Sequence, residues 1–484
     1  MTPLWFSKKI RMATEMLEDN GLTLFFISCY IIGVFCACSA LLKARTPQGA
    51  MAWVISLLLF PFISVPFFLV FGQTKFEGYN VRRRLMDQKV QKLFYELDPI
   101  SSSFTASSEE MRLITSTLSN SSQPGFTVKN QVSLLIDGKE TYASMQREIE
   151  NAKNYIIFQS YIFREDEIGE KFIELLIKKA QSDIRVTFIH DNIGNNISSG
   201  LLKRLKEAGV RVGPFNDKIL KHKIQINFRN HRKILIIDGR VGFIGGLNIG
   251  DDYLGKWPKW GDWRDTHMRI EGPAVIAAQL ASAKDWYFSK EVPMDVDWKI
   301  HESEGDAAVM ILPTGPADER HTCLLAHIAL INSANERLWI ANPYFVPPES
   351  LVDALILASL RGVDVKVLIP AYSDAHLIQL ASEVYQDRLI DHGIKIFKYN
   401  KGFLHQKVML VDDKFSTIGS VNFDCRSMFI NFEVTSIVSD RKFTQQVTEM
   451  LQKDFSSAIQ IVNRKRNVLK AISSRSANLF APML

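Results

Sequence analysis

The sequence has few cysteines, and their spacing matches no common structural site. Only five occur among 484 residues. Three fall in one short stretch and the other two are isolated, at Cys29, Cys36, Cys38, Cys323 and Cys425. This distribution excludes a disulfide framework and a zinc-ligand spacing, and it fits a reducing compartment such as the cytosol.

Charge is missing from two long stretches near the N-terminus. No charged residue occurs from Leu22 to Leu42 or from Met51 to Phe71. A helix of about 20 residues spans a hydrocarbon core of about 30 Å, so each run is long enough to cross a membrane. A signal peptide followed by a buried helix is the alternative. The first run is too long for a signal core, however, and a second equal run follows at once. We therefore expect a hairpin of transmembrane helices near 22–42 and 51–71.

The basic residues around this hairpin indicate its orientation. The connection between the runs carries only Lys43 and Arg45. The flanking segments carry Lys8, Lys9, Arg11, Lys75, Arg82, Arg83 and Arg84. The positive-inside bias then predicts a multi-pass protein with both ends, and the rest of the chain, in the cytoplasm.

The remaining composition is that of a globular protein. Hydrophobic residues make up 46% and charged residues 23%, and the length suits two or three domains. The net charge of +6 suits nucleic acid or anionic lipid, and the membrane hairpin favours lipid. We divide the chain into the N-terminal segment 1–78, a basic helix and serine-rich linker 79–126, and two halves, 127–300 and 301–484.

One short pattern occurs once in each half. The first copy is His231-Arg232-Lys233, Asp238 and Gly245-Gly246-Leu247-Asn248; the second is His405-Gln406-Lys407, Asp412 and Gly419-Ser420-Val421-Asn422. In both copies the histidine leads the lysine by two residues and the aspartate by seven, and the glycine pair opens seven residues later. Two coincident copies predict one site built from two related halves.

The repeat extends well beyond these motifs. Buried-strand patterns at 155–158 and 338–340 are followed by amphipathic helices at 169–180 and 351–360, and then by strands at 184–189 and 363–369. Alternating strands and helices predict an α/β fold with mostly parallel or mixed sheets covered by helices, its two repeats packed about a pseudo-twofold axis. The first half contains ten extra residues before its motif, including Lys218, Lys221, His222 and Lys223.

The motif chemistry suits phosphoryl transfer. If each motif lies on a strand, His231 and Lys233 point to one face, as do His405 and Lys407. Lysine and asparagine donors suit phosphate oxygens, and the two imidazoles can act as nucleophile and general acid. Paired histidines also bind metals, but an adjacent ammonium repels a cation. We therefore expect no metal and no cofactor.

The duplicated pattern resembles the phospholipase D superfamily, and the whole chain resembles its bacterial cardiolipin synthases with two spans. The supporting stretches are Ala50–Trp53, Asn342–Pro347, Gly402–Lys407, Asp424–Ser427 and Asn431–Glu433. The resemblance implies an enzyme of the bacterial inner membrane, with phospholipids rather than nucleic acid as partners. It implies transfer of a phosphatidyl group between two phosphatidylglycerol molecules through a phosphatidyl-histidine, without metal or nucleotide. Phosphatidylethanolamine is an alternative partner for one of the two lipids.

The same resemblance suggests individual roles. Lys233, Lys407, Asn248 and Asn422 are expected at the phosphate, with the Ser420 hydroxyl and the backbone of Gly245, Gly246 and Gly419 beside it. His231 is expected as nucleophile and His405 as general acid and then base, although a near-symmetric site leaves that order open. We expect Ser420→Ala to impair activity more than Gly246→Ala if the hydroxyl serves the chemistry.

Four acidic residues have expected supporting roles. Asp238 and Asp412 lie an odd number of residues from their histidines, so strand alternation aims them away from the cleft, and we expect them to be structural. Asp265 in the first half and Glu433 in the second are the candidates that hold the histidine tautomers. A surface ion pair is the alternative for each.

Two further segments suggest contact with lipid. Tryptophan and lysine alternate from Lys256 to Trp263, and the tail combines Arg464–Arg466 with Val468-Leu469 and Leu479-Phe480. These patterns are typical of membrane interfaces, with a buried core and a solvated tail as their alternatives. Hydrolysis by a phospholipase D, a membrane-anchored nucleic-acid phosphodiesterase and a non-enzymatic scaffold remain the competing functions.

Overall fold

A computed structural model of the chain describes residues 4–44, 46–72, 108–118, 125–195, 197–215, 227–259, 261–318, 320–462 and 467–483. The chain divides into an N-terminal unit, residues 1–76 with 218–227, and a larger unit that holds the rest. Four predicted features lie wholly or mainly outside the described residues. These are the basic helix after residue 78, the insertion around Lys218–Lys223, Trp260 and the basic cluster Arg464–Arg466.

The N-terminal unit contains one helix long and apolar enough to cross a membrane. Helix α1 (Leu4–Lys43) carries this stretch at Thr23–Lys43. The second apolar run is divided between α2 (Pro47–Leu59) and α3 (Pro61–Phe71). The expected single helix at 51–71 is therefore wrong: Phe60 leaves the helical region, with φ −134° and ψ 57°. Pro61 lacks the N–H that would continue α2 and instead begins α3.

The two short helices fold back on each other. The rings of Trp53 in α2 and Phe68 in α3 lie 5.2 Å apart, and Ser64 Oγ donates to the carbonyl of Ser56 at 2.9 Å. A straight helix would separate residues 53 and 68 by about 22 Å. The bend packs on α1 at Gly33, where an added Cβ would meet the carbonyl oxygen of Leu57 at 2.7 Å. The α2–α3 pair therefore turns near the middle of the apolar part of α1.

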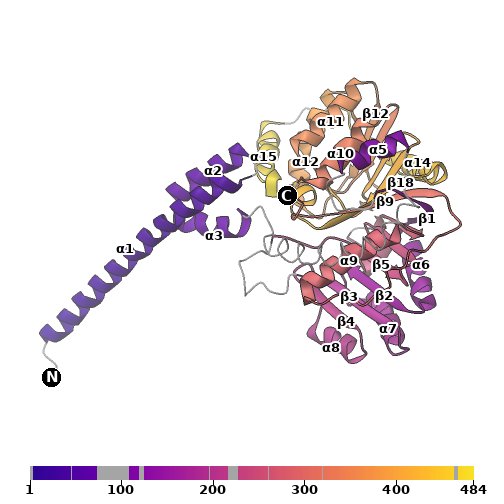
Figure 1. Ribbon diagram of the computed structural model, residues 1–484. Helices are drawn as coiled ribbons and strands as arrows, with labels where there is room; N and C mark the ends of the chain where they lie inside the picture. Colours follow the sequence, from indigo (N-terminus) through magenta and orange to yellow (C-terminus); the bar gives the residue numbers. More distant parts are fainter. Residues whose placement is uncertain are drawn as a thin grey trace. The chain divides into compact units, whose positions relative to one another are not determined.

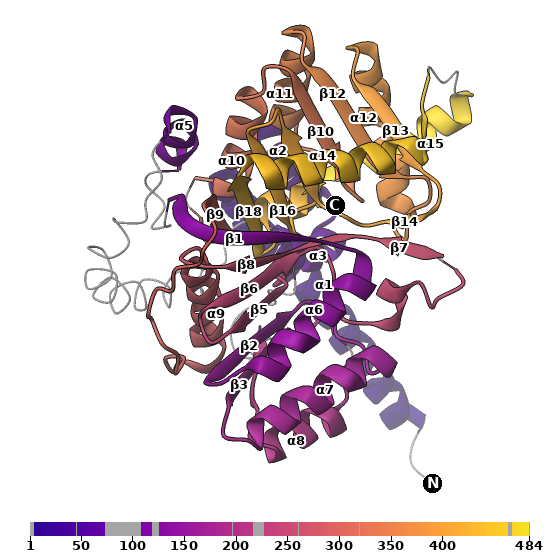
Figure 2. The ribbon, with the colours of Figure 1, turned by 90° about the vertical axis from the view of Figure 1, so that its right-hand side faces the viewer.

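The larger unit is built on one 15-stranded mixed sheet (Figures 1 and 2). Its order is β19-β13-β12-β10-β15-β16-β18-β9-β1-β8-β6-β5-β2-β3-β4. Apart from the edge strand β19, the order reads as two matching halves that meet where β1 and β9 pair in antiparallel fashion. In each half three strands are parallel and the others antiparallel. The predicted α/β architecture with two repeats is confirmed.

The first repeat contains, in order, β1 (Thr127–Ile136), α6 (Asp137–Asn151), β2 (Tyr155–Ser160), α7 (Glu167–Ala180), β3 (Arg185–Asp191), α8 (Ser199–Glu207), β4 (Arg211–Phe215), β5 (Ile234–Ile237), β6 (Val241–Gly245), η1 (Asp251–Leu254), β7 (Asp262–Arg264), β8 (Thr266–Glu271) and α9 (Val275–Lys290).

The second repeat contains β9 (Ala307–Thr314), α10 (Thr322–Asn332), β10 (Arg337–Ala341), β11 (Phe345–Val346), α11 (Glu349–Leu360), β12 (Asp364–Pro370), α12 (His376–Asp391), β13 (Lys395–Tyr399), β14 (Gly402–Leu404), β15 (Val408–Val411), β16 (Phe415–Gly419), β17 (Phe423–Asp424), α13 (Cys425–Phe429), β18 (Glu433–Ser439), α14 (Arg441–Ser456), β19 (Ala458–Gln460), α15 (Val468–Asn478) and η2 (Ala481–Met483).

Three apolar cores support the sheet. One lies between the first repeat and helices α6, α7 and α8, and a second between the other repeat and α10, α11 and α12. The third joins both repeats, because α9 and α14 pack there with strand residues such as Ile236 and Leu410. A shared core of this kind holds the two halves in one fixed relation.

Part of the predicted serine-rich linker is helical. Helix α5 (Glu109–Thr117) begins at Ser108, whose side chain accepts from the N–H of Met111. Ile114 is 1% exposed and packs in the same core as Phe126. The linker assignment for 101–123 is therefore wrong over this stretch, because one apolar side of α5 packs against the second repeat.

The two copies of the repeated motif enter their strands from an extended segment. His231 and Lys233 precede β5, and His405 and Lys407 precede β15, so the expected placement of these residues within a strand is slightly wrong. Each segment pairs with the opposite repeat. Asn230 bridges to Phe432, and β14 pairs in parallel with β7, which matches Leu404 with Arg264.

Candidate active site

Both motif histidines line one cavity of about 500 Å³ in the larger unit. The cavity draws on both repeats, with Asn248 and Trp263 from the first and Asn422 and Asp424 from the second. Its size is typical of a site for a small molecule or a lipid headgroup. The two copies of the motif therefore form a single site, as predicted.

Each histidine is held by a carboxylate from the other repeat. Nδ1 of His231 lies 2.9 Å from Oε2 of Glu433, and Nδ1 of His405 lies 2.7 Å from Oδ2 of Asp265. A carboxylate only accepts, so Nδ1 carries the proton and Nε2 carries the lone pair in each neutral ring. Each carboxylate reaches the other repeat's histidine because the segments before the two histidines pair across the repeats. Asn230 pairs with Phe432, which precedes Glu433, and Leu404 pairs with Arg264, which precedes Asp265.

The two carboxylates differ in their surroundings. Glu433 also accepts from the hydroxyls of Ser420 and Ser427 and from Nδ2 of Asn431. Asp265 accepts from the N–H of Thr266 in addition to His405. Both side chains are fully buried. Burial opposes ionisation, but the facing histidines and lysines lower the pKa of Glu433 and of Asp265.

The two lysines lie deep in the protein. Burial lowers the pKa of Lys233 well below its usual value and that of Lys407 to about 8. Nζ of Lys233 donates to the carbonyl of its own His231 at 2.7 Å. Nζ of Lys407 lies 3.0 Å from both ring nitrogens of His405. A bound phosphate anion would favour the charged form of both ammonium groups.

The two histidines differ in the charged groups that act on their pKa and in the contacts of their rings. Burial, and then the Lys407 ammonium, lowers the pKa of His405 to about 4. Burial also lowers the pKa of His231, and Glu433 opposes it. Among the described residues, the ring of His231 is hydrogen-bonded through Nδ1 alone, whereas both ring nitrogens of His405 lie 3.0 Å from Nζ of Lys407. Nε2 of His231 therefore has no hydrogen-bond partner among the described residues.

The motif aspartates act on the backbone and not on the histidines. The carboxylate of Asp238 accepts from the N–H groups of Lys153, Asn154 and Tyr155 at 2.7–2.8 Å. Asp412 accepts in the same way from Asn335, Glu336 and Arg337 at 2.8–3.3 Å. The two aspartates have φ values of 54° and 51°. Each ties the turn after β5 or β15 to the start of β2 or β10.

The two motif asparagines are not equivalent. Nδ2 of Asn248 donates to the hydroxyl of Tyr253, and its Oδ1 accepts from the N–H of Ile162. Oδ1 of Asn422 is buried and has no hydrogen-bond partner among the described residues. Asn248 is therefore held by the protein, while Asn422 has more capacity left for a ligand.

The motif serine and glycines make room for other protein groups. Ser420 bonds Glu433 and accepts from the N–H of Val434. A Cβ on Gly246 would lie 2.1 Å from Oδ1 of Asp265, and one on Gly245 would lie 2.4 Å from Nδ1 of His267. At Gly419 the close atom is the carbonyl oxygen of Val434, at 2.3 Å. None of these four residues lines the cavity, and neither do Lys233 and Lys407, so contact of the motif serine and glycines with phosphate stays a prediction.

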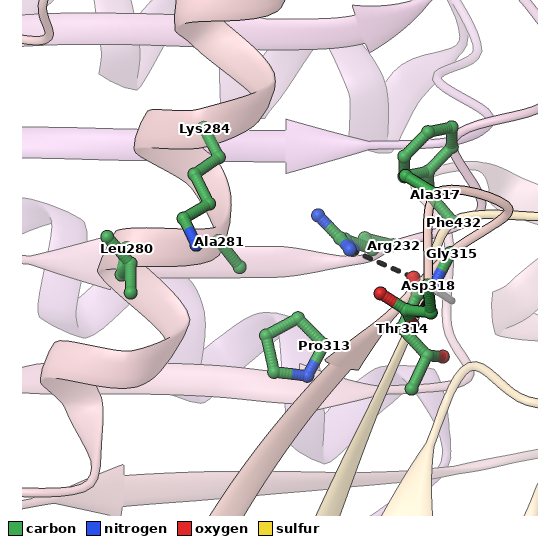
Figure 3. A pocket seen from close by; sticks show the side chains of 10 residues that line it. All are labelled: Arg232, Leu280, Ala281, Lys284, Pro313, Thr314, Gly315, Ala317, Asp318 and Phe432. Atoms are coloured by element: carbon green, nitrogen blue, oxygen red, sulfur yellow. Dashed lines mark hydrogen bonds between the residues drawn. The ribbon is translucent and has the colours of Figure 1, made fainter. Parts of the chain in front are cut away.

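The residue between each histidine and lysine, Arg232 or Gln406, binds buried groups of the protein and so fixes the position of the motif. Arg232 pairs with Asp285 of α9 at 2.8 Å. It also donates to the carbonyl of Thr314 (Figure 3). A cavity of about 20 Å³ beside Arg232 has room for one water molecule. In the second repeat Gln406 donates to Asp454 of α14, which Arg264 also binds.

Aromatic residues that sequence reasoning did not assign surround the histidines. The Tyr161 ring lies 4.8 Å from the His231 ring, and the Trp263 ring lies 5.2 Å from the His405 ring. Trp263 also packs on Phe403 at 4.7 Å. The tryptophan-rich segment thus has two environments, because Trp263 is buried while Trp257 is 42% exposed beneath Arg164. The sequence signal that could have placed Trp263 beside a histidine is its position two residues before Asp265.

This arrangement can carry out a two-step displacement at phosphorus. One neutral imidazole supplies an oriented lone pair, and the other can move a proton with support from its carboxylate. Buried ammonium groups stabilise negative charge on the non-bridging oxygens. Aromatic and buried walls limit the access of water to the reacting atoms.

Comparison with known proteins gives a consistent result across the chain. The family described as "Cardiolipin synthase, PLD-like domain" matches residues 145–257 and 327–455, one segment in each repeat. Cardiolipin synthase A of Pseudomonas putida is 37% identical over 464 residues, covering 94% of this chain and 96% of its own. Cardiolipin synthase A of Pseudomonas aeruginosa is 37% identical over 478 residues, with 97% of each chain covered.

A solved structure has a similar fold. Phosphatidylserine synthase of Haemophilus influenzae superposes with a TM-score of 0.61 over 77% of this chain and 100% of its own, at 14% identity. At this identity the similarity concerns the fold alone.

Proposed function

The chain belongs to the cardiolipin synthases of the phospholipase D superfamily, and on that premise we propose that its two histidines catalyse phosphatidyl transfer between two phosphatidylglycerol molecules. The chain is a phosphatidyltransferase. The observation that carries the proposal is the pair of crossed contacts, His231 with Glu433 and His405 with Asp265, which orient the two histidines that line one cavity. A buried lysine lies beside each histidine, although neither lysine lines the cavity itself.

The first step forms a covalent intermediate. Nε2 of His231 attacks phosphorus in the donor lipid, and the bond from phosphorus to the headgroup glycerol oxygen breaks. For this step His405 must be an imidazolium, a form that the Asp265 carboxylate and the bound phosphodiester anion favour. It gives the proton on Nε2 to that oxygen, so free glycerol leaves and a phosphatidyl-histidine remains. Lys233 and Lys407 bind the non-bridging oxygens, where charge develops in the transition state.

The second step returns the enzyme to its starting state. The neutral His405 removes a proton from a headgroup hydroxyl of the second phosphatidylglycerol, and that oxygen attacks phosphorus. The bond from phosphorus to Nε2 of His231 breaks, which releases cardiolipin. One phosphodiester is exchanged for another, so the reaction is reversible and needs no external energy source.

Two contacts support His231 as the nucleophile. His231 lines the cavity, and its ring lacks the ammonium contact that Lys407 makes at 3.0 Å to both ring nitrogens of His405. Glu433 shares its negative charge with three further donors. Burial keeps the pKa of His231 below its usual value, so the ring is neutral and Nε2 has the lone pair that the attack requires.

Trapping the intermediate tests this assignment. With labelled phosphatidylglycerol, His405→Ala should retain label on the protein, because the base for the second step is missing. His231→Ala should form no labelled protein. The reverse pattern would exchange the two roles.

The function itself is tested with the full-length enzyme in phosphatidylglycerol vesicles. We expect equal amounts of cardiolipin and glycerol, and no phosphatidic acid beyond a trace. Phosphatidic acid without cardiolipin would replace the proposal with hydrolysis. Mixed vesicles with phosphatidylethanolamine show whether that lipid serves as one partner.

We further propose a membrane topology in which α1 crosses once and the α2–α3 pair re-enters from the side of its C-terminus. The chain after Phe71 then leaves on the side of Lys43 and Arg45. That side also receives Lys75 and the arginines at 82–84, which outnumber the three basic residues Lys8, Lys9 and Arg11 that precede the apolar stretch of α1. The positive-inside bias places the catalytic repeats in the cytoplasm and the N-terminus outside.

Epitope tags at the two ends of the chain test this topology. In intact spheroplasts the N-terminal tag should be accessible to antibody, and the C-terminal tag should become accessible only after lysis. If both tags require lysis, the two-span hairpin expected from the sequence is the better description.

A further inference from the structure

The cavity wall has an asymmetric charge although the motifs are repeated. Two residues before the histidine, the first repeat has Arg229 and the second has Phe403. Four residues after the asparagine, the first repeat has Asp252 and the second has Arg426. Arg229 and Arg426 therefore have no basic counterparts across the pseudo-twofold axis. This difference adds positive charge to only one part of the cavity.

Both arginines face the same cavity as the histidines. Arg229 is 22% exposed and pairs with Asp191 at 3.2 Å. Nη2 of Arg426 lies 3.5 Å from Oδ1 of Asn431, which also contacts Glu433 through its Nδ2. Burial lowers the pKa of the Arg426 guanidinium, the Asp424 carboxylate in the same cavity wall opposes this shift, and the charge of Arg229 adds to it. The two guanidinium groups thus repel each other, and an anion between them would relieve this repulsion.

A third arginine in the cavity has a different environment. Arg164 pairs with the buried carboxylate of Asp252 at 3.1 Å, and its guanidinium lies 4.9 Å from the centre of the Trp257 ring. Its charge is matched by a carboxylate within the cavity wall. By contrast, the carboxylate bound by Arg229 is also bonded by the N–H groups at 193, 194 and 230. Asp191 therefore takes up only part of the Arg229 charge.

We propose that Arg229 and Arg426 form a second phosphate site, which binds the phosphodiester of the acceptor lipid. The inference rests on the proposed function, in which the acceptor is a phospholipid. A phosphatidylglycerol acceptor carries one phosphodiester anion three carbons from its attacking hydroxyl. Guanidinium groups bind phosphate through two parallel hydrogen bonds. Water and free glycerol lack this anion, so the site favours a lipid acceptor over both.

Two assays on the same variants separate this role from catalysis. Cardiolipin formation in phosphatidylglycerol vesicles requires an acceptor with a phosphate. Exchange of labelled glycerol into phosphatidylglycerol uses the same histidines and an acceptor without a phosphate. We expect Arg426→Gln and the Arg229→Gln, Arg426→Gln double variant to slow cardiolipin formation about tenfold or more. Glycerol exchange should stay within about threefold of the wild type.

Two further variants serve as controls. Arg426→Lys keeps the charge without the planar pair of donors, so its cardiolipin rate should lie between those of wild type and Arg426→Gln. Arg204→Gln removes an exposed arginine of α8 that pairs with Glu170, outside the cavity, and should leave both rates unchanged. Arg426→Gln alone carries the test if loss of the ion pair with Asp191 prevents folding.

Equal losses in both assays would overturn the inference, because the arginines would then serve the donor phosphate or the fold. Unchanged cardiolipin formation would overturn it as well. Failure of the proposed function has a different signature: the wild-type enzyme itself would make no cardiolipin from phosphatidylglycerol.

Discussion

Nδ1 of His231 lies 2.9 Å from the Glu433 carboxylate, although 202 residues separate them along the chain. The second pair, His405 and Asp265, crosses in the opposite direction over 140 residues. Each repeat thus supplies a histidine to the site and the carboxylate that orients the other repeat's histidine. The active site is one unit, and neither repeat contains a complete half of it.

The crossed carboxylates should be essential although they do not touch the substrate. Glu433→Gln and Asp265→Asn should each lower kcat by about 10²-fold to 10⁴-fold, because an amide no longer secures the Nδ1–H tautomer or stabilises imidazolium. The measurement is steady-state cardiolipin formation, and thermal unfolding should show folded variants. Glu302→Gln, at an exposed position, is the matched control. Losses under fivefold would mean that these carboxylates do not orient the histidines.

Gly246 and Ser420 occupy equivalent positions with different tasks, which revises the expectation from sequence. Gly246→Ala brings a methyl group to 2.1 Å from Oδ1 of Asp265 and must displace that carboxylate from His405. Ser420→Ala removes one of several donors to Glu433. We therefore expect Gly246→Ala to reduce kcat at least as much as Ser420→Ala.

A nearby glycine provides the control for that comparison. A Cβ on Gly242, in the same strand β6, would meet Val275 at an ordinary 3.5 Å. Gly242→Ala should therefore retain nearly full activity. A larger effect of Ser420→Ala than of Gly246→Ala would restore the original expectation.

Activity should decline in mildly alkaline solution because Lys407 is buried. Its pKa falls to about 8, so the ammonium is present below that pH and is lost above it. The neutral amine binds phosphate less well, and kcat/KM, which reports the free enzyme, should fall as pH rises through about 8. Lys407→Arg should have lower activity but no such decline, since guanidinium stays charged. A wild-type profile that is flat to about pH 9.5 would contradict this cause.

The motif aspartates should contribute to stability and not to chemistry. Asp238→Ala or Asp412→Ala leaves three backbone N–H groups without their acceptor, which should lower the free energy of unfolding by about 2 kcal/mol or more. The folded variants should keep kcat within about threefold. Asp413→Ala, at the exposed neighbouring position, should change neither quantity. Loss of kcat in a variant with wild-type stability would assign the aspartates a catalytic role.

Much of the site followed from the sequence because its information is local. The spacing of His, Lys and Asp places their side chains by simple alternation, which correctly separated Asp238 from the cleft. Crossing of the carboxylates could not be predicted, since it depends on pairing between segments far apart, such as Asn230 with Phe432. The same limit applies to the roles of Tyr161 and Trp263.

Two errors arose where composition was used in place of local signals. The absence of charge predicts one helix over 51–71, but Pro61 lies in the middle of this run and cannot continue a helix begun before it. The serine content predicts a linker, but Ser108 followed by two glutamates is typical of a helix start. In both places, capping and breaking residues were more informative than average hydrophobicity.

Because the pairs cross between repeats, the site cannot be assembled until the second repeat has been synthesised. Translation proceeds at about 5–20 residues per second, so the 202 residues between His231 and Glu433 take on the order of 10–40 seconds to emerge. During that interval the apolar N-terminal helices have already left the ribosome, and the nascent chain meets the membrane with an unsupported imidazole. The enzyme becomes competent only when its last repeat is made, so truncated chains bound to the lipid surface cannot cleave the bilayer that holds them.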